Sequence, residues 1–209
     1  RMTVIPPFMM TEEYNTANID EDLAAKLNDG KKHFRTVGRV VPNKGHSHLI
    51  NTVFSYVNFF GPEIKLHVVG SLNMQDKRYY YELENLINNL HLGEQINFHQ
   101  NTNFNEMLTY YCTADALIMM SEHEGFCVPI AEAQLYKLPI IALDRGAVGE
   151  TLGANQLLFK EPDYDIFAVA LHRITQDQIL GEIVTKNGIN NFNQRFQSKV
   201  ILNQLLSLI

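Results

Sequence analysis

Apolar segments rich in β-branched residues alternate with helical patterns along most of the chain. The segments between the strands carry apolar residues at helical spacing, and in residues 49–60 one helix face would hold Leu49, Ile50, Val53, Phe54, Val57 and Phe60. Strands that are apolar on both faces and separated by helices predict a parallel sheet covered on each side. Six segments have the strand pattern: FRTVGRVV (34–41), IKLHVVG (64–70), INFHQ (96–100), ALIMM (116–120), PIIAL (139–143) and QLLF (156–159).

This alternation predicts an α/β fold: a doubly wound, mostly parallel, Rossmann-like sheet of about six strands with helices on both faces. Residues 1–30 do not fit the alternation, so we expect a linker and one helix there, followed by the Rossmann-like domain over residues 31–209. Asn103 and Glu106 have the spacing of a capping box, and Asn187-Gly188 predicts an interruption of the last helical region. In such a fold the ligand lies beyond the carboxyl ends of the strands.

Composition and charge narrow the class. The 209 residues are 45% hydrophobic and 19% charged, which suits a domain with a sizeable core. The net charge of -6 disfavours nucleic acid as a partner, and no apolar run approaches the ~18 residues that cross a bilayer. Cys112 and Cys127 form neither a disulfide framework nor a zinc pattern, so we expect a reducing, cytoplasmic setting. The opening Arg1 and VIPP favour a piece of a larger protein.

The stretch SEHEGFCVPIAEA (121–133) follows the fourth predicted strand and holds the first candidate site. Gly125 allows close backbone approach or a positive φ angle. Glu124 would stay in the loop, and Glu132 would fall one turn into the next helix. The backbone amides of residues 126–128 would point at a ligand near the helix start. The alternative is an ordinary helix N-terminus whose acids favour the helix dipole, and spacing alone does not separate the two.

The second candidate site is VGRVVPNKG (37–45), where Gly38 and Arg39 end a strand and Lys44 opens the next helix. Arg39 and Lys44 could converge on an anionic group at the same sheet edge as Glu124. The pattern is neither a Walker loop nor GxGxxG. A solvated turn with two surface cations is the alternative interpretation. A metal site is not predicted, because histidines at i and i+2, such as His46 and His48, cannot share a helix face.

Taken together, G-R-x4-K-G, a strand ending in Gly70, and E-G-F-x-V-P-x-x-E resemble family 4 of the retaining nucleotide-sugar glycosyltransferases. That family has the GT-B fold, in which two Rossmann-like domains face each other across a cleft. The resemblance covers nearly the whole chain and corresponds to the carboxyl-terminal, donor-binding domain. GAVGETLG (146–153) also resembles the family's segment after the fifth strand.

The resemblance implies roles for individual residues. Arg39 and Lys44 would bind the donor's pyrophosphate and stabilise the leaving nucleoside diphosphate without an obligatory metal or other cofactor. Glu124 would lie by the transferred sugar, and Glu132 would accept hydrogen bonds from the ribose hydroxyls. Arg39, Lys44 and Glu124 are therefore the candidate catalytic residues. The candidate nucleotide-sugar-binding residues are Gly38, Arg39, Lys44, Gly70, Gln100, Glu124, Gly125, Phe126, Cys127, Val128 and Glu132.

Two positions depart from the family pattern. Cys127 stands where family members commonly have Gly or Ala, so its side chain either narrows the sugar site or points away from it. It also raises a nucleophile hypothesis, which no Cys-His-Asn arrangement supports. The usual Gly is replaced near Gln100-Asn101, where the resemblance suggests that the base binds. A loop that only caps the next helix is the alternative there.

The implied function is donor binding in a retaining hexosyltransferase of bacterial polysaccharide or lipopolysaccharide synthesis. Mannose from GDP-mannose is one candidate donor, and UDP-sugars stay open. The saccharide or lipid-linked acceptor would sit on an amino-terminal domain that this sequence lacks, so we expect the fragment alone to be inactive. That domain would also hold the enzyme at the inner face of the membrane. The alternatives are a sugar-nucleotide 2-epimerase-like domain and a non-catalytic nucleotide-binding or interaction module.

Overall fold

The structure, a computed structural model, describes residues 5–9 and 18–207. Within these residues six strands form one sheet in the order β3-β2-β1-β4-β5-β6, and every neighbouring pair is parallel. The order reverses between β1 and β4, the switch point at which doubly wound sheets bind ligands. The predicted fold class is confirmed. The strands are β1 (Lys32–Val37), β2 (Ile64–Val69), β3 (Ile96–His99), β4 (Ala116–Met119), β5 (Ile140–Leu143) and β6 (Leu157–Phe159).

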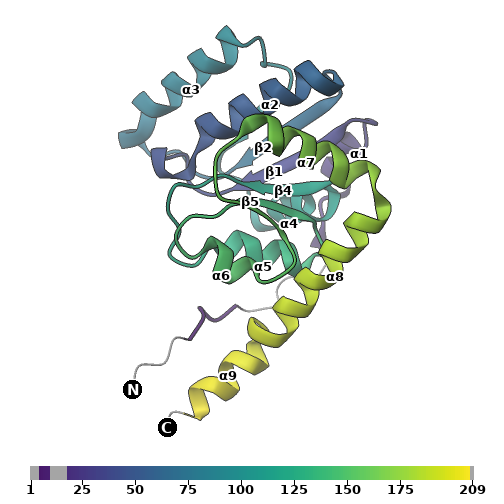
Figure 1. The fold of residues 1–209 in the computed structure, drawn as a ribbon. Helices are drawn as coiled ribbons and strands as arrows, with labels where there is room; N and C mark the ends of the chain where they lie inside the picture. Colours follow the sequence, from purple (N-terminus) through teal and green to yellow (C-terminus); the bar gives the residue numbers. More distant parts are fainter. Residues whose placement is uncertain (1–4, 10–17, 208–209) are drawn as a thin grey trace.

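Helices cover both faces of the sheet, as Figure 1 shows. The larger apolar core lies under α2, α3 and α7, and a smaller core lies under α4, α5 and α6. On one face the helices are α2 (His46–Phe60), α3 (Lys77–Asn89) and α7 (Tyr164–Gln176), and on the other they are α4 (Phe104–Thr113), α5 (Val128–Leu135) and α6 (Val148–Leu152). The remaining helices are α1 (Glu21–Leu27), which packs on α4, α8 (Gln178–Arg195), which packs on α5 and α7, and α9 (Ser198–Leu206).

The predicted linker lies partly outside the described residues, which omit residues 1–4 and 10–17. Met9 is buried with Ala131 and Phe196, and its carbonyl accepts a 2.7 Å hydrogen bond from the Ser198 hydroxyl. This segment therefore lies against α5 and the start of α9. The expected helix is α1, although the boundary at residue 30 stays a prediction. No helix within the described ranges is long and apolar enough to span a bilayer.

Two local predictions have different outcomes. The Asn103–Glu106 capping box is present, with reciprocal bonds of 3.0 and 2.8 Å. The interruption predicted at Asn187-Gly188 is wrong, because α8 continues to Arg195. A Cβ atom on Gly188 would lie 3.2 Å from the Gln134 Cγ, so this glycine serves the close crossing of α8 and α5.

The predicted apolar face of α2 also needs correction. Leu49, Ile50 and Val53 are buried, whereas the side chains of Phe54 and Phe60 are exposed to 37% and 38%. Tyr56 is the aromatic residue buried there, because it follows Val53 by three residues and turns toward the sheet.

A row of histidines crosses the α4 side of the sheet, so β1 and β2 are not apolar on both faces as predicted. His33 Nδ1 lies 2.8 Å from His67 Nε2, and His67 Nδ1 lies 2.9 Å from His99 Nε2. The ends of the row are Asp29, 2.9 Å from His33 Nε2, and the Tyr110 hydroxyl, 2.9 Å from His99 Nδ1.

The row has one direction of donation. The hydrogen bond from His33 lowers the pKa of Asp29, so its carboxylate only accepts. When the three imidazoles are neutral, each donates from Nε2 and accepts at Nδ1, and the Tyr110 hydroxyl donates at the far end. A second proton on His67 would face the Nε2–H group of His99, so the row takes it up only if the bonds from His67 to Tyr110 reverse their direction. Burial, with the neighbouring charges of His99 and His33 next in effect, lowers the pKa of His67 to about 3.

We expect this row to make the fold acid-sensitive. The pKa of His67 is about 3 in the fold against 6.5 without the fold. The unfolded chain therefore binds a proton below pH 6.5 that the folded chain rejects, and stability falls as pH drops from 6.5 toward 3. The slope from this group is at most about 1.4 kcal/mol per pH unit.

Urea unfolding measured between pH 7 and pH 4.5 checks this expectation. His67→Gln should flatten the pH dependence, and His123→Gln, at an exposed position, should keep it. Identical slopes for wild type and His67→Gln would refute the assignment.

Candidate functional site

The loops after β1, β2 and β4 touch backbone to backbone. A Cβ atom on Gly70 would lie 1.8 Å from the Gly38 carbonyl oxygen. A Cβ atom on Gly45, where φ is +66°, would lie 1.9 Å from the Met120 carbonyl oxygen. Neither position tolerates a side chain, since real Cβ contacts are never this short. The two predicted loops, residues 37–45 and 121–133, are therefore held at one edge of the sheet.

An ion pair joins these two loops. Lys44 ends a short 3-10 helix (Pro42–Lys44), and its Nζ lies 2.6 Å from Glu124 Oε1. The Ser121 hydroxyl donates to the same oxygen at 2.7 Å. The stem of Lys44 passes beside Gly38, whose Cβ position is 3.4 Å from Lys44 Cε. An anion that binds Lys44 must therefore share this ammonium group with Glu124.

Arg39 is exposed at the same edge and forms no ion pair with the described residues. It lines a cavity of about 260 Å³ over the carboxyl ends of β1, β2 and β3. Gly38 and Gly70 also line this cavity. Gln100, which was predicted to contact the nucleotide, is exposed and is not among the described residues that line this cavity. The next two residues, Asn101 and Thr102, line it. The full lining is Val37, Gly38, Arg39, Val69, Gly70, Ser71, Asn101, Thr102 and Met107.

The turn into α5 differs from the prediction at two residues. Gly125 does not have a positive φ, and no atom of the described residues lies within 4 Å of its Cβ position. Cys127 has the positive φ instead, at 70°. Its side chain is 4% exposed and packs in the core with Met119 and Ile130. It therefore points away from the loop surface, and the left-handed backbone explains why a glycine suits this position.

Cys127 is not set up as a nucleophile. Burial, followed by the nearby charge of Glu124, raises the pKa of the Cys127 thiol to about 12. The reactive form of cysteine is the thiolate. A neutral, buried thiol at this position acts as a small packing residue.

Glu132 lies in α5 and is 6% exposed. Its Oε2 accepts a 2.6 Å hydrogen bond from the Tyr111 hydroxyl. Sequence reasoning missed Tyr111, as it missed Ser121 and Arg35, which stacks on Tyr111. One signal was available: Arg35 is a charged residue within a segment, 34–41, that was predicted to form a strand apolar on both faces.

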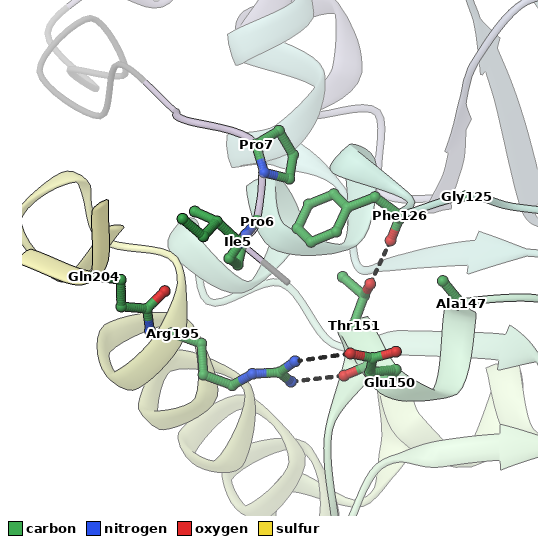
Figure 2. Close-up of a pocket in the computed structure, with 10 residues that line it drawn as sticks. All are labelled: Ile5, Pro6, Pro7, Gly125, Phe126, Ala147, Glu150, Thr151, Arg195 and Gln204. Carbon is green, nitrogen blue, oxygen red and sulfur yellow. Dashed lines mark hydrogen bonds and ion pairs between the residues drawn. The ribbon is translucent and has the colours of Figure 1, made fainter. Parts of the chain in front are cut away.

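A second cavity, of about 280 Å³, adjoins the Gly125–Phe126 segment (Figure 2). Arg195 reaches across from α8, and its Nη1 donates to the Glu150 carbonyl at 2.6 Å. The Phe126 ring packs edge-to-face on Phe196, and the Phe126 carbonyl accepts from the Thr151 hydroxyl. The contacts with Thr151 and Phe196 fix the position of Phe126 on the side of this second cavity. The lining is Ile5, Pro6, Pro7, Gly125, Phe126, Ala147, Glu150, Thr151, Arg195 and Gln204.

The fold and this edge define a Rossmann-like domain in which the loops after β1 and β4 meet at the topological switch point. Residues 18–191 match the family model described as "Glycosyl transferases group 1", and the chain belongs to that family. The predicted resemblance to glycosyltransferases of the GT-B fold is thereby confirmed.

Two curated relatives are similar to this chain. It is 26% identical over 180 residues to the capsular polysaccharide biosynthesis glycosyltransferase CapM of Staphylococcus aureus, covering 82% of this chain and 44% of the relative. It is 28% identical over 151 residues to the O-antigen chain mannosyltransferase RfbU of Salmonella typhimurium, covering 72% and 39%. The chain thus spans less than half the length of the curated relatives it matches.

Solved structures share the fold. Anabaena Alr3699/HepE in complex with UDP and glucose has a TM-score of 0.85 at 20% identity, covering 99% of this chain and 56% of that one. The carboxyl-terminal domain of the group 1 protein LpcC of Francisella tularensis has a TM-score of 0.72 at 23% identity, covering 88% and 98%. The second match aligns this chain with nearly the whole of an isolated carboxyl-terminal domain.

Two glycine variants test the backbone contacts at this edge. Gly70→Ala should destabilise the fold by ~1–3 kcal/mol or more, since the new methyl group meets a carbonyl oxygen that the sheet holds in place. Gly125→Ala should change stability by less than about 0.5 kcal/mol, because its methyl group enters open space. Thermal unfolding of the two variants measures both effects. Equal stability of Gly70→Ala and wild type would contradict the close approach.

Proposed function

We propose that this chain is the donor-binding half of a retaining glycosyltransferase that acts in bacterial polysaccharide or lipopolysaccharide synthesis. The complete enzyme, with its second domain, transfers a hexose from a nucleoside diphosphate sugar to a saccharide or lipid-linked acceptor. The observation that carries the proposal is that Arg39 lines the cavity over β1, β2 and β3, and that the Lys44 side chain passes beside Gly38, which lines the same cavity, in a chain of the group 1 family. Retention rests on the Glu124–Glu132 spacing and the family resemblance.

In this proposal the donor extends along the sheet edge. The nucleoside occupies the cavity over β1, β2 and β3, and Asn101 and Thr102 face the base. The pyrophosphate lies between Arg39 and Lys44. The sugar lies by Glu124 and the amides of residues 126–128, where a helix start favours hydrogen bonding to oxygen.

Arg39 and Lys44 then act on the leaving group. When the bond between the anomeric carbon and the phosphate oxygen breaks, the electron pair goes to the diphosphate, and both cations stabilise the added charge. These residues supply the positive charge themselves, so we propose no cofactor and no obligatory metal. As the diphosphate binds Lys44, the ion pair between Lys44 and Glu124 weakens. The Glu124 carboxylate then turns toward the sugar hydroxyls.

The donor's identity is a narrower proposal. The name of the Salmonella relative supports mannose, for which GDP-mannose is the candidate donor. The Anabaena structure contains UDP, so uridine is the competing base. The acceptor is assigned to a further domain, because the curated relatives are more than twice as long as their matched share. The same domain would hold the enzyme at the cytoplasmic face of the membrane.

Charge removal at the sheet edge tests the pyrophosphate assignment. Arg39→Ala and Lys44→Ala should each weaken binding of GDP or UDP by ~1.5–3 kcal/mol, the usual scale for charge-assisted hydrogen bonds. Calorimetry measures this loss. The matched control is Arg78→Ala, an exposed arginine on α3 that pairs with Glu82 and should change nothing.

Guanosine and uridine are the control ligands for this experiment. They lack phosphate, so the Arg39 and Lys44 variants should bind them like wild type. Equal losses for nucleoside and diphosphate would contradict the assignment. If neither diphosphate binds wild type, a non-catalytic interaction module replaces the proposed function.

The division of labour between two domains is tested separately. This chain should bind its donor but transfer no sugar, because the acceptor is not positioned and water is not excluded. A transfer assay beside the full-length protein, on preparations with the same nucleotide affinity, makes the comparison. Efficient transfer by residues 1–209 alone would show that the acceptor site is on this half.

A further inference from the structure

Arg35 is a buried cation with few partners. Its side chain is 0% exposed in β1, and its Nη1 donates to the Met107 carbonyl at 3.2 Å. Its Nε and Nη2 have no hydrogen-bond partner among the described residues. Its guanidinium carbon instead lies 3.4 Å from the centre of the Tyr111 ring. Burying a cation this way is costly unless an opposite charge compensates it.

Tyr111 connects this cation to Glu132. The ring takes the guanidinium on its π face, where the quadrupole is negative. Its hydroxyl donates to Glu132 Oε2 at 2.6 Å. Burial, with the charge of Glu132 next, raises the pKa of Tyr111 well above its usual value, so the hydroxyl keeps its proton and stays a donor.

The three groups balance one another electrically. Burial lowers the pKa of Arg35 to about 10, and Tyr111 and Glu132 oppose that fall. Arg35 is therefore a cation at neutral pH, and the Glu132 carboxylate is the nearby anion. The Tyr111 hydroxyl fixes one oxygen of the Glu132 carboxylate, and a carboxylate has acceptor sites for about four hydrogen bonds.

Arg35 lies next to residues that line the cavity proposed to take the nucleoside. Met107, which accepts the Arg35 bond, lines that cavity, and so does Val37, two residues beyond Arg35 on the same face of β1. Glu132 is not among the described lining residues. Its reach to a ligand therefore depends on the direction in which its carboxylate is held.

We propose that Tyr111 is a positioning residue that aims Glu132 at the ribose hydroxyls of the nucleotide, and that Arg35 holds the Tyr111–Glu132 pair in place. This inference rests on the proposed function. It adds two residues through which the site distinguishes ribose from a sugar without those hydroxyls. The competing explanation is that Glu132 is only the counter-charge of Arg35, with no part in binding.

The test compares two ligands on each variant of the 209-residue chain. Calorimetry gives the affinity for the natural diphosphate, GDP or UDP, and for its 2′,3′-dideoxy analogue. The ratio of the two affinities reports ribose recognition alone, so a general loss of stability does not change it. For Tyr111→Phe we expect this ratio to fall about tenfold, which corresponds to about 1.4 kcal/mol.

Tyr110→Phe is the matched control. It removes the neighbouring hydroxyl on α4, which bonds His99 rather than Glu132, and it should keep the wild-type ratio. An unchanged ratio in Tyr111→Phe, or an equal fall in Tyr110→Phe, would overturn the inference.

Two further variants separate the possible failures. Glu132→Gln should lower the ratio at least as far as Tyr111→Phe, and the double variant should lower it no further. If Glu132→Gln keeps the ratio, the ribose assignment in the proposed function is wrong. If Glu132→Gln lowers it but Tyr111→Phe does not, only the positioning role is wrong. Arg35→Met, which keeps volume without charge, should also lower the ratio, and a wild-type ratio there would remove Arg35 from the inference.

Discussion

Backbone contact between loops is the constraint on which the candidate site depends. Two backbone contacts, between Gly70 and Gly38 and between Gly45 and Met120, bring together the loops that follow β1, β2 and β4. A side chain at Gly70 or Gly45 would prevent this close approach. Parallel pairing alone places these loops at one edge of the sheet, but only within reach of long side chains. The glycines shorten that distance until Lys44 meets Glu124 at 2.6 Å. The charged groups are therefore positioned by the backbone before any ligand arrives.

Two pairs of opposite charges lie close to these loop contacts, and they differ in burial. Lys44 is partly exposed and joins Glu124, which is buried, between two loops at the sheet edge, where an incoming diphosphate can compete for the ammonium group. Arg35 and Glu132 lie inside, with Tyr111 between them, where neither charge can move without leaving the other uncompensated. The Lys44–Glu124 pair suits a site that rearranges when the donor binds. The buried pair suits a site that stays fixed, which is what selection of one sugar hydroxyl pattern requires.

Sequence pattern was sufficient for the sheet and the two loops, because apolar runs and helix spacing report burial directly. It placed Lys44 and Glu124 at one edge but could not show their ion pair, which depends on glycine contacts between segments 80 residues apart. The sequence pattern gave wrong predictions where one residue type is compatible with more than one structural role. Gly188 looked like a helix break but serves a helix crossing, and Cys127 took the left-handed turn expected of Gly125. The histidines of β1, β2 and β3 joined across strands, a register that one chain segment does not reveal.

The central claim is that a nucleoside diphosphate binds across the carboxyl ends of β1, β2, β3 and β4. Backbone amide chemical shifts recorded during titration with GDP and UDP test it most directly. The account predicts that the largest changes fall on residues 37–45, 70–71, 101–102 and 121–132, and that they saturate with the affinity found by calorimetry. Changes confined to the far side of the molecule, such as the groove of α8 lined by Lys137, Gln178 and Lys186, would contradict it.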